Sequence, residues 1–78
     1  MKAYEVIEKY GWVQKRFGNE YDGFCVLGAL LNAYYPSPKY WEMSEAIIQA
    51  IGSDIVEWND RQERTKDQVI TILKQVEL

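Results

Sequence analysis

Apolar residues recur at helical spacing along most of the chain and divide it into five segments. The first, residues 2–10, has apolar side chains three and four positions apart, charged residues between them, and a terminating Gly11. A polar connection follows, in which one helical turn is expected at residues 12–15. Residues 23–34 then contain FCVLGALL, which is apolar on all sides. Because a helix of that kind is surrounded by others, residues 23–34 are predicted to form a buried central helix.

Two residues indicate how the central helix is held in place. Asp22 precedes it and is a suitable N-cap, because a carboxylate accepts hydrogen bonds from the backbone N–H groups of a first turn. Gly28 lies inside the helix, at a cost of roughly 1 kcal/mol relative to alanine. We expect this glycine to permit a close approach between two helices.

The sequence YYPSPKYW contains the clearest break in the chain. Pro36 disfavours a helical conformation at the residue before it, and Ser37 followed by Pro38 has the pattern of an N-cap and a first helical position. The third helix is therefore expected to run from there to about Ile51, with Gly52 just beyond its end. Its buried stripe is predicted to comprise Trp41, Ile47, Ile48 and Ile51.

The C-terminal part of the chain predicts two more helices. Ser53 can cap a short helix from residue 54 to about residue 58 or 59. Thr65 stands three residues before Gln68, which is the spacing of a capping box, and so begins the last helix. The apolar stripe of that helix is predicted to comprise Val69, Ile72, Leu73 and Val76. No segment has the alternation of a strand, so the expected fold is all-α: a compact bundle of about five short helices.

Length and composition support a single helical domain over residues 1–78. Of the 78 residues 47% are hydrophobic, and three Trp and six Tyr supply enough volume for a compact core. One cysteine excludes an intramolecular disulfide and favours a reducing, cytoplasmic location. No apolar run reaches the roughly 18–20 residues of a membrane span. The net charge of −3, with acids and bases interleaved, argues against nucleic acid as a partner.

Two motifs occur together in this chain. CVLGAL (residues 25–30) has the pattern Cys-x-x-Gly-Ala-Leu, and WND (residues 58–60) is followed by RT (residues 64–65) at the start of the last helix. Together they resemble a domain-of-unknown-function family of small helical proteins of bacteria and their phages. The resemblance covers the chain from about residue 4 to residue 76 and implies the fold, with no established activity. The matching positions are Gly11, Trp12, Cys25, Gly28, Ala29, Leu30, Trp58, Asn59, Asp60, Arg64 and Thr65.

Cys25 is the only thiol that could act as a nucleophile. In the first turn of the central helix its pKa could be lowered by the helix dipole, but its apolar neighbours favour a small core residue. The chain has no histidine, which excludes Cys–His catalysis and a zinc site built by one chain. Asp54, Glu57 and Asp60 lie three apart, a spacing more typical of a solvated helix face than of a metal site. We therefore predict a non-enzymatic protein without cofactor or metal.

The stretch EWNDRQERTKDQV (residues 57–69) carries a second group of candidates. A structural interpretation assigns its conspicuous residues to the core, to a turn and to a helix cap; they are Trp58, Asn59, Asp60, Arg64 and Thr65. Asp60 is then expected to accept hydrogen bonds from Arg64 or from the N–H groups that open the last helix. An Arg–carboxylate pair on a short loop also holds ligand carboxylates or phosphates. A small-ligand or enzyme site around Cys25, Asp60 and Arg64 therefore stays open as an alternative.

The turn between the second and third helices is rich in aromatic residues. Tyrosine and tryptophan are favoured at the centres of protein interfaces. The candidate partner-binding residues are Tyr34, Tyr35, Tyr40 and Trp41. The leading hypothesis is a non-enzymatic interaction module, an accessory protein of a bacterium or phage, that binds another protein or itself through this surface. An inhibitor or decoy of a host defence complex is the alternative within the same class.

Overall fold

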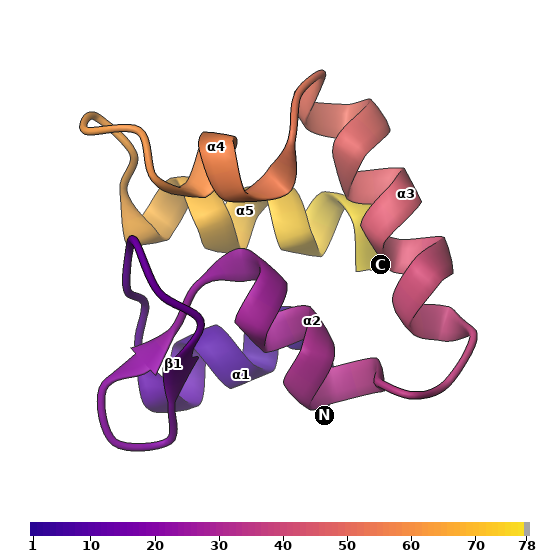
Figure 1. Ribbon diagram of the computed structural model, residues 1–78, viewed down its shortest axis with the longest axis horizontal. Helices are drawn as coiled ribbons and strands as arrows, with labels where there is room; N and C mark the ends of the chain where they lie inside the picture. Colours follow the sequence, from indigo (N-terminus) through magenta and orange to yellow (C-terminus); the bar gives the residue numbers. More distant parts are fainter. Residues whose placement is uncertain (78) are drawn as a thin grey trace.

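The computed structural model describes residues 1–77 as five helices and one two-stranded antiparallel sheet (Figure 1). In chain order the elements are α1 (Ala3–Tyr10), β1 (Gly18–Asn19), β2 (Gly23–Phe24), α2 (Val26–Tyr34), α3 (Lys39–Ile51), α4 (Ile55–Asn59) and α5 (Lys66–Glu77). The mostly helical class predicted from the sequence is confirmed. The expectation of an all-α chain is wrong at the sheet.

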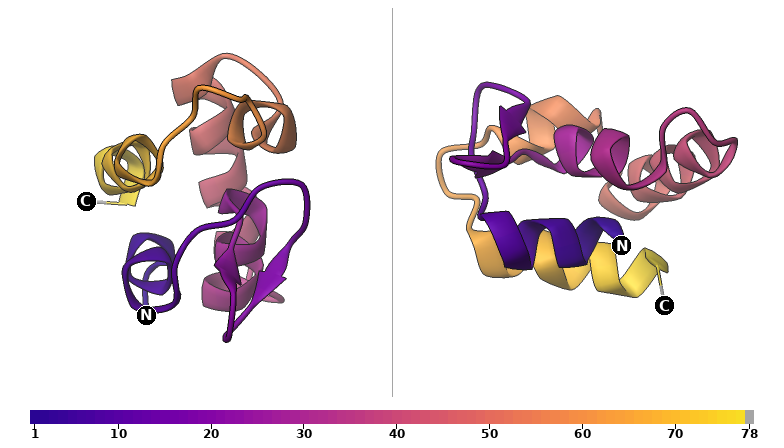
Figure 2. Two further views of the ribbon diagram at one scale, coloured as in Figure 1. Left: turned by 90° about the vertical axis from the view of Figure 1, so that its left-hand side faces the viewer. Right: turned by 90° about the horizontal axis from the view of Figure 1, so that it is seen from below.

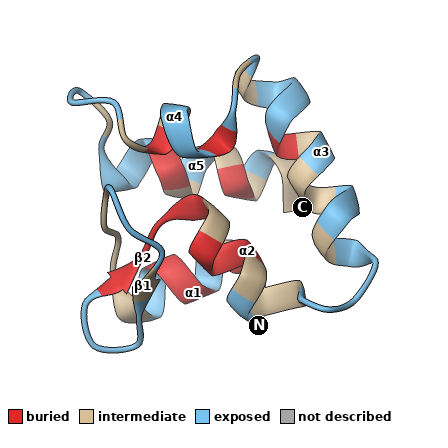
Figure 3. Cartoon of the chain, in the orientation of Figure 1, coloured by how far each residue is buried: buried red, intermediate tan, exposed pale blue. Residues whose placement is uncertain are grey.

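The elements form two layers. Helices α1 and α5 lie side by side and antiparallel in one layer, and α2, α3, α4 and the sheet lie in the other (Figure 2). Buried residues occur in each of the helices and in β2 (Figure 3). The hydrophobic core consists of Ala3, Val6, Ile7, Phe24, Val26, Ala29, Leu30, Ile47, Ile55, Val69 and Leu73. Of residues 1–77, no helix is both long and apolar enough to span a membrane.

Helix α2 is shorter and less enclosed than the sequence indicates. It begins at Val26, and its N-cap is Cys25 and not Asp22. It contacts α1, α3, α4 and β2, but Asn32 is exposed and Leu31 is half-buried. The predicted buried central helix at residues 23–34 is therefore not confirmed.

The residues before α2 form a hairpin where a loop was expected. The two strands pair Gly18 with Phe24 and Asn19 with Gly23. The side chain of Asn19 closes the turn, because its Oδ1 accepts from the backbone N–H of Asp22 at 2.8 Å. The carboxylate of Asp22 turns back to Arg16, 2.9 Å from its Nη1. The hydrogen bond from Arg16 holds the pKa of Asp22 below its ordinary value.

Helix α3 ends at Ile51 and is followed by Gly52, as predicted, but it begins at Lys39, with Pro38 and not Ser37 in the N-cap position. Ser37 Oγ accepts from the backbone N–H of Lys39 at 3.1 Å, which fixes the start of the helix after the proline turn. At the other end Gly52 has φ 71°, in the left-handed region, and its N–H donates to Ile48 O at 2.8 Å. A glycine is favoured there because it has no Cβ to strain that conformation.

The predicted buried stripe of α3 is correct for only half of its members. Ile47 is fully buried and Ile51 is half-buried, but Trp41 is 57% exposed and Ile48 is 39% exposed. The inner face is completed by Tyr40 and Met43, which pack against the core. Trp41 and Ile48, seven positions apart, therefore share an outward-facing side of the helix.

The last two helices begin with side-chain caps. Helix α4 is capped by Asp54, whose Oδ2 accepts from the N–H of Glu57 at 3.0 Å, and not by Ser53. The capping box before α5 is confirmed in both directions. Gln68 N–H donates to Thr65 Oγ1 at 3.2 Å, and Thr65 N–H donates to Gln68 Oε1 at 3.0 Å. Val69 and Leu73 are fully buried on the inner side of α5.

Candidate functional site

Asn59 is the buried polar centre of the fold, with an exposed fraction of 1%. Its Oδ1 accepts from Trp12 Nε1 at 2.7 Å and from the backbone N–H of Val26 at 3.0 Å. Its Nδ2 donates to Val13 O at 3.2 Å and to Asp60 Oδ1 at 3.0 Å. One amide group thus joins the loop after α1, the first residue of α2 and the end of α4.

The loop that follows Trp12 is fastened to the same end of α4. Lys15 has φ 68°, an unusual conformation for a residue with a side chain, and its N–H donates to Asp60 Oδ1 at 2.8 Å. Gln14 Nε2 donates to Asn59 O at 3.0 Å and to Arg61 O at 2.7 Å. The helical turn expected at residues 12–15 is therefore absent. The loop has an irregular backbone conformation that is held by hydrogen bonds to side chains.

Arg64 and Asp60 have different partners, which corrects the predicted pair. The guanidinium of Arg64 lies 3.8 Å above the centre of the Trp58 ring, and its Nε donates to Trp58 O at 3.0 Å. Its Nη1 donates to Gln68 Oε1 at 3.3 Å. Arg64 thus ties the end of α4 to the start of α5, while Asp60 serves the loop at Lys15.

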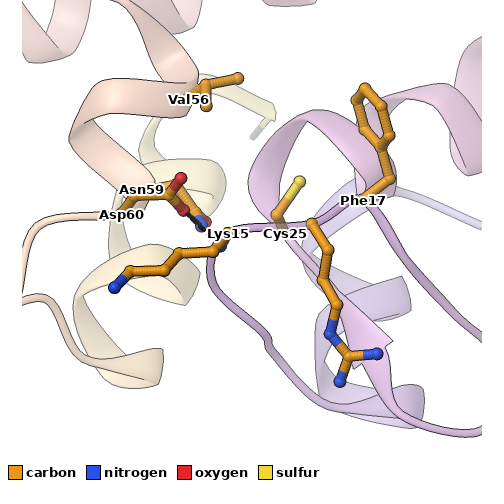
Figure 4. A pocket seen from close by; sticks show the side chains of 7 residues that line it. Lys15, Phe17, Cys25, Val56, Asn59 and Asp60 are labelled. Carbon is orange, nitrogen blue, oxygen red and sulfur yellow. Dashed lines mark hydrogen bonds between the residues drawn. The ribbon is translucent and has the colours of Figure 1, made fainter.

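A cleft of about 200 Å³ opens beside Asn59. Its lining residues are Lys15, Arg16, Phe17, Cys25, Val56, Asn59 and Asp60 (Figure 4). Arg64 does not line it, so the candidate site of Cys25, Asp60 and Arg64 does not come together. Across residues 1–77, no group of three or more His, Cys, Asp or Glu is placed to hold a metal ion.

Cys25 lines this cleft and has an exposed fraction of 5% (Figure 4). Its Sγ accepts from the N–H of Gly28 at 3.2 Å, so the thiol acts as the N-cap of α2. Burial raises the pKa of the Cys25 thiol, and this outweighs the hydrogen bonds that lower it. The side chain is a capping and packing group with low thiolate content, contrary to the alternative of an activated nucleophile.

We expect folded Cys25 to react with DTNB at pH 8 about a hundredfold more slowly than in the urea-unfolded chain, because reaction requires local opening. Cys25→Ala should lower the free energy of unfolding by about 1–2 kcal/mol, and Cys25→Ser should lose less because it keeps an acceptor at the cap. Stopped-flow labelling and urea unfolding measure the two effects. Equal labelling rates in the folded and unfolded chain would contradict the capping role.

Three aromatic side chains form a second candidate site, the aromatic patch, which comprises Tyr35, Tyr40 and Trp41. The ring centroids of Tyr40 and Trp41 are 5.1 Å apart, those of Tyr35 and Tyr40 5.6 Å, and those of Tyr35 and Trp41 6.0 Å. Tyr35 and Trp41 are each 57% exposed, whereas Tyr40 is half-buried against the core. The patch is therefore a cluster fixed on its inner side and open on its outer side.

Tyr34, the fourth predicted member, points away from the patch. Its hydroxyl donates to the carboxylate of Glu77. Burial, followed by the hydrogen bond to Glu77, raises the pKa of Tyr34. The same carboxylate accepts from the N–H groups of Ala3 and Tyr4 at 2.8 and 2.9 Å, so Glu77 caps α1. Tyr34 thus belongs to the contact between the two ends of the described chain.

The DUF6197 family, described as a family of unknown function, matches the chain over residues 1–77. The chain belongs to this family. No curated protein and no solved structure matches it. In this DUF6197 member, Trp58, Asn59 and Arg64 connect α4 to its neighbours, and Cys25 and Thr65 cap helices. Membership in this family therefore does not identify an activity.

Proposed function

We propose that this DUF6197 member is a non-enzymatic protein-interaction module that binds another protein through the aromatic patch. One observation carries the proposal: three rings are packed against each other while Tyr35 and Trp41 remain 57% exposed. Large exposed apolar groups gathered at one place are typical of interaction sites. Ile48, 39% exposed two turns further along α3, extends the apolar side of the helix.

The magnitude of burial supports this use of the surface. Covering the exposed half of each ring removes roughly 100 Å² of apolar surface from water, worth about 2–3 kcal/mol per ring. The rings already hold one another in place, so binding immobilises few additional rotors. A partner that covers Tyr35 and Trp41 thus gains most of the free energy of burying the two rings, at a small cost in side-chain entropy.

The setting that we propose is the cytoplasm of a bacterium or of a phage-infected cell, where the protein acts as an accessory factor. The single free thiol supports a reducing compartment. The net charge of −3 is compatible with an inhibitor or decoy that imitates an acidic ligand of a host defence complex. Strong salt dependence of partner binding would favour that version, because screening weakens contacts between exposed charges.

Trp41→Ala is expected to reduce partner capture strongly without unfolding the protein. Proteins retained by wild type, by Trp41→Ala and by Tyr21→Ala are compared, and each candidate is purified and titrated calorimetrically. Tyr21 is the control because it is 95% exposed and lies on the hairpin, away from α3 (Figure 1). A direct partner should bind Trp41→Ala about thirtyfold more weakly, the effect of a hot-spot residue worth about 2 kcal/mol, and Tyr21→Ala equally well. Equal binding to all three proteins would sink the proposal.

A further inference from the structure

We infer that the segment covering the aromatic patch is basic and apolar: a partner stretch in which an Arg or Lys stands next to aliphatic residues. The inference rests on the proposed function and adds the chemistry of the partner. Two observations lead to it, the distribution of the molecule's own cations over its aromatic rings and the charge along the border of the patch.

The chain already places its cations over aromatic rings elsewhere. Four such contacts occur, with distances from the cation to the ring centroid of 3.8–5.9 Å: Arg64–Trp58, Lys9–Tyr10, Lys74–Tyr4 and Lys39–Tyr34. Within residues 1–77, none of these contacts involves a ring of the aromatic patch. The patch therefore consists of rings whose faces have no cation from the same chain, and exposed faces of this kind attract one at about 0.5–2 kcal/mol.

The border of the patch is acidic. Glu42 and Glu45 follow Trp41 by one and four positions on α3, and both are exposed. In the described part of the chain neither forms an ion pair with a Lys or Arg, and Glu45 Oε1 only accepts from Gln49 Nε2 at 3.3 Å. Lys39, the cation at the start of α3, lies over the Tyr34 ring. An incoming cation thus meets aromatic faces and two carboxylates together.

The apolar half of the partner follows from the spacing on α3. Trp41 and Ile48 are seven positions apart, about 10 Å along the helix axis. If a cation of the partner binds between the Trp41 ring and Glu45, Ile48 lies two turns further along α3. An aliphatic side chain of the partner can contact Ile48 there. A second copy of this chain fits poorly, because its patch would bring another pair of acids against Glu42 and Glu45.

The test is a selection from a library of random 12-residue peptides displayed on phage, run against wild type and against Trp41→Ala. Peptides enriched by wild type alone should contain Arg or Lys together with Leu, Ile or Val. Synthetic versions should bind Glu42→Lys/Glu45→Lys about tenfold or more weakly than wild type, and should bind less well as salt is raised. Glu20→Lys/Glu63→Lys changes the net charge equally at exposed positions outside the patch and should bind as wild type does.

Each other outcome has a distinct meaning. Neutral or acidic peptides that still require Trp41 would overturn the basic partner and keep the interaction surface. A dimer in analytical ultracentrifugation that is lost in Trp41→Ala would assign the patch to a second copy, which also overturns the inference. Peptides that bind wild type and Trp41→Ala alike, or no enrichment at all, would remove both the inference and the proposed function.

Discussion

Asn59→Ala should lower the free energy of unfolding by about 3–4 kcal/mol, because two N–H groups would lose their acceptor inside the fold. These are the indole N–H of Trp12 and the backbone N–H of Val26, which donate to Asn59 Oδ1 at 2.7 and 3.0 Å. A buried donor without a partner costs about 1–3 kcal/mol. A domain of this size has only about 5–10 kcal/mol in total, so the variant should be marginally folded at 25 °C.

Urea unfolding should be followed by far-UV circular dichroism. Tryptophan fluorescence is less suitable, because the substitution removes the hydrogen bond of the Trp12 indole and so changes its emission in the folded state. Asn32→Ala is the control, because Asn32 is exposed on α2 and its loss should change stability by less than about 0.5 kcal/mol. Asn59→Asp tests the donor side: at pH 7 the new carboxylate would face Asp60 and could not donate to Val13 O. The difference in unfolding free energy between Asn59→Asp and wild type should become smaller in mildly acidic buffer, where the new carboxyl group is protonated.

A loss below about 1 kcal/mol for Asn59→Ala would show that water replaces the amide. In that case Asn59 would not be the joint between α2, α4 and the loop after α1. An Asn59→Asp deficit that does not change with pH would likewise show that the donor bond to Val13 contributes little.

The helices could be predicted from the sequence because their signals are local. Apolar spacing located five segments, and the capping box at Thr65 and Gln68 was read correctly from two residues three positions apart. The hairpin was missed because strands of two residues, Gly18–Asn19 and Gly23–Phe24, are too short to show alternation. The signal that existed was GNEYDG (residues 18–23), in which Asn, Asp and two glycines give a typical turn composition.

Caps were less predictable than helices because several residues compete for each. Asp22 precedes α2 and has the better capping chemistry, yet Arg16 and Asn19 bind its carboxylate in the hairpin. Cys25 is the N-cap instead, because the helix begins only at Val26. Its sulfur accepts a hydrogen bond from one of the backbone N–H groups that have no partner within the first turn of α2. The position of one helix start was therefore decided by a turn that the sequence pattern did not reveal.

The candidate site around Asn59 depended on contacts between distant parts of the chain. Asn59 and Asp60 were recognised as turn residues, but their partners Trp12, Gln14 and Lys15 lie about 45 positions earlier. No local pattern joins these positions, so the sequence favoured the neighbour in the chain, an Asp–Arg pair. Glu77, which caps α1 from the far end of α5, was missed for the same reason.

The sequence located the aromatic turn, but it did not show which of its aromatic side chains are buried and which are exposed. Tyr34 and Tyr35 are adjacent, but Tyr34 is the last residue of α2 and its hydroxyl donates to Glu77. Tyr35 follows the helix with an extended backbone, and its ring lies in the patch. On α3 the predicted stripe was right for Ile47 and Ile51 but wrong for Trp41 and Ile48, which were counted as core and are exposed. The exposure of Trp41 beside Tyr35 is informative, because exposed apolar groups gathered in a patch are unusual, whereas single ones are common.

Gly28→Ala should destabilise the protein by about 2–3 kcal/mol, although alanine at an open helical position gains roughly 1 kcal/mol over glycine. The sequence predicted a close approach between two helices at this glycine. The approach is instead between α2 and the backbone of the hairpin: a Cβ on Gly28 would overlap the carbonyl oxygen of Phe17. That oxygen accepts from the N–H of Cys25 at 3.0 Å, so moving it away breaks the bond at the start of α2.

Gly52→Ala separates this steric effect from a conformational one. A Cβ on Gly52 would meet no atom within 4 Å, but its φ of 71° is strained for alanine, so a loss of about 1 kcal/mol is expected from the backbone alone. Gly28 is not among the positive-φ glycines, and its whole cost should come from Phe17. Amide hydrogen exchange should accordingly show faster exchange at Cys25 and in the hairpin for Gly28→Ala only. If Gly28→Ala raised the unfolding free energy, the hairpin would be free to move away from α2, and the cleft walled by Phe17 and Cys25 would have no fixed shape.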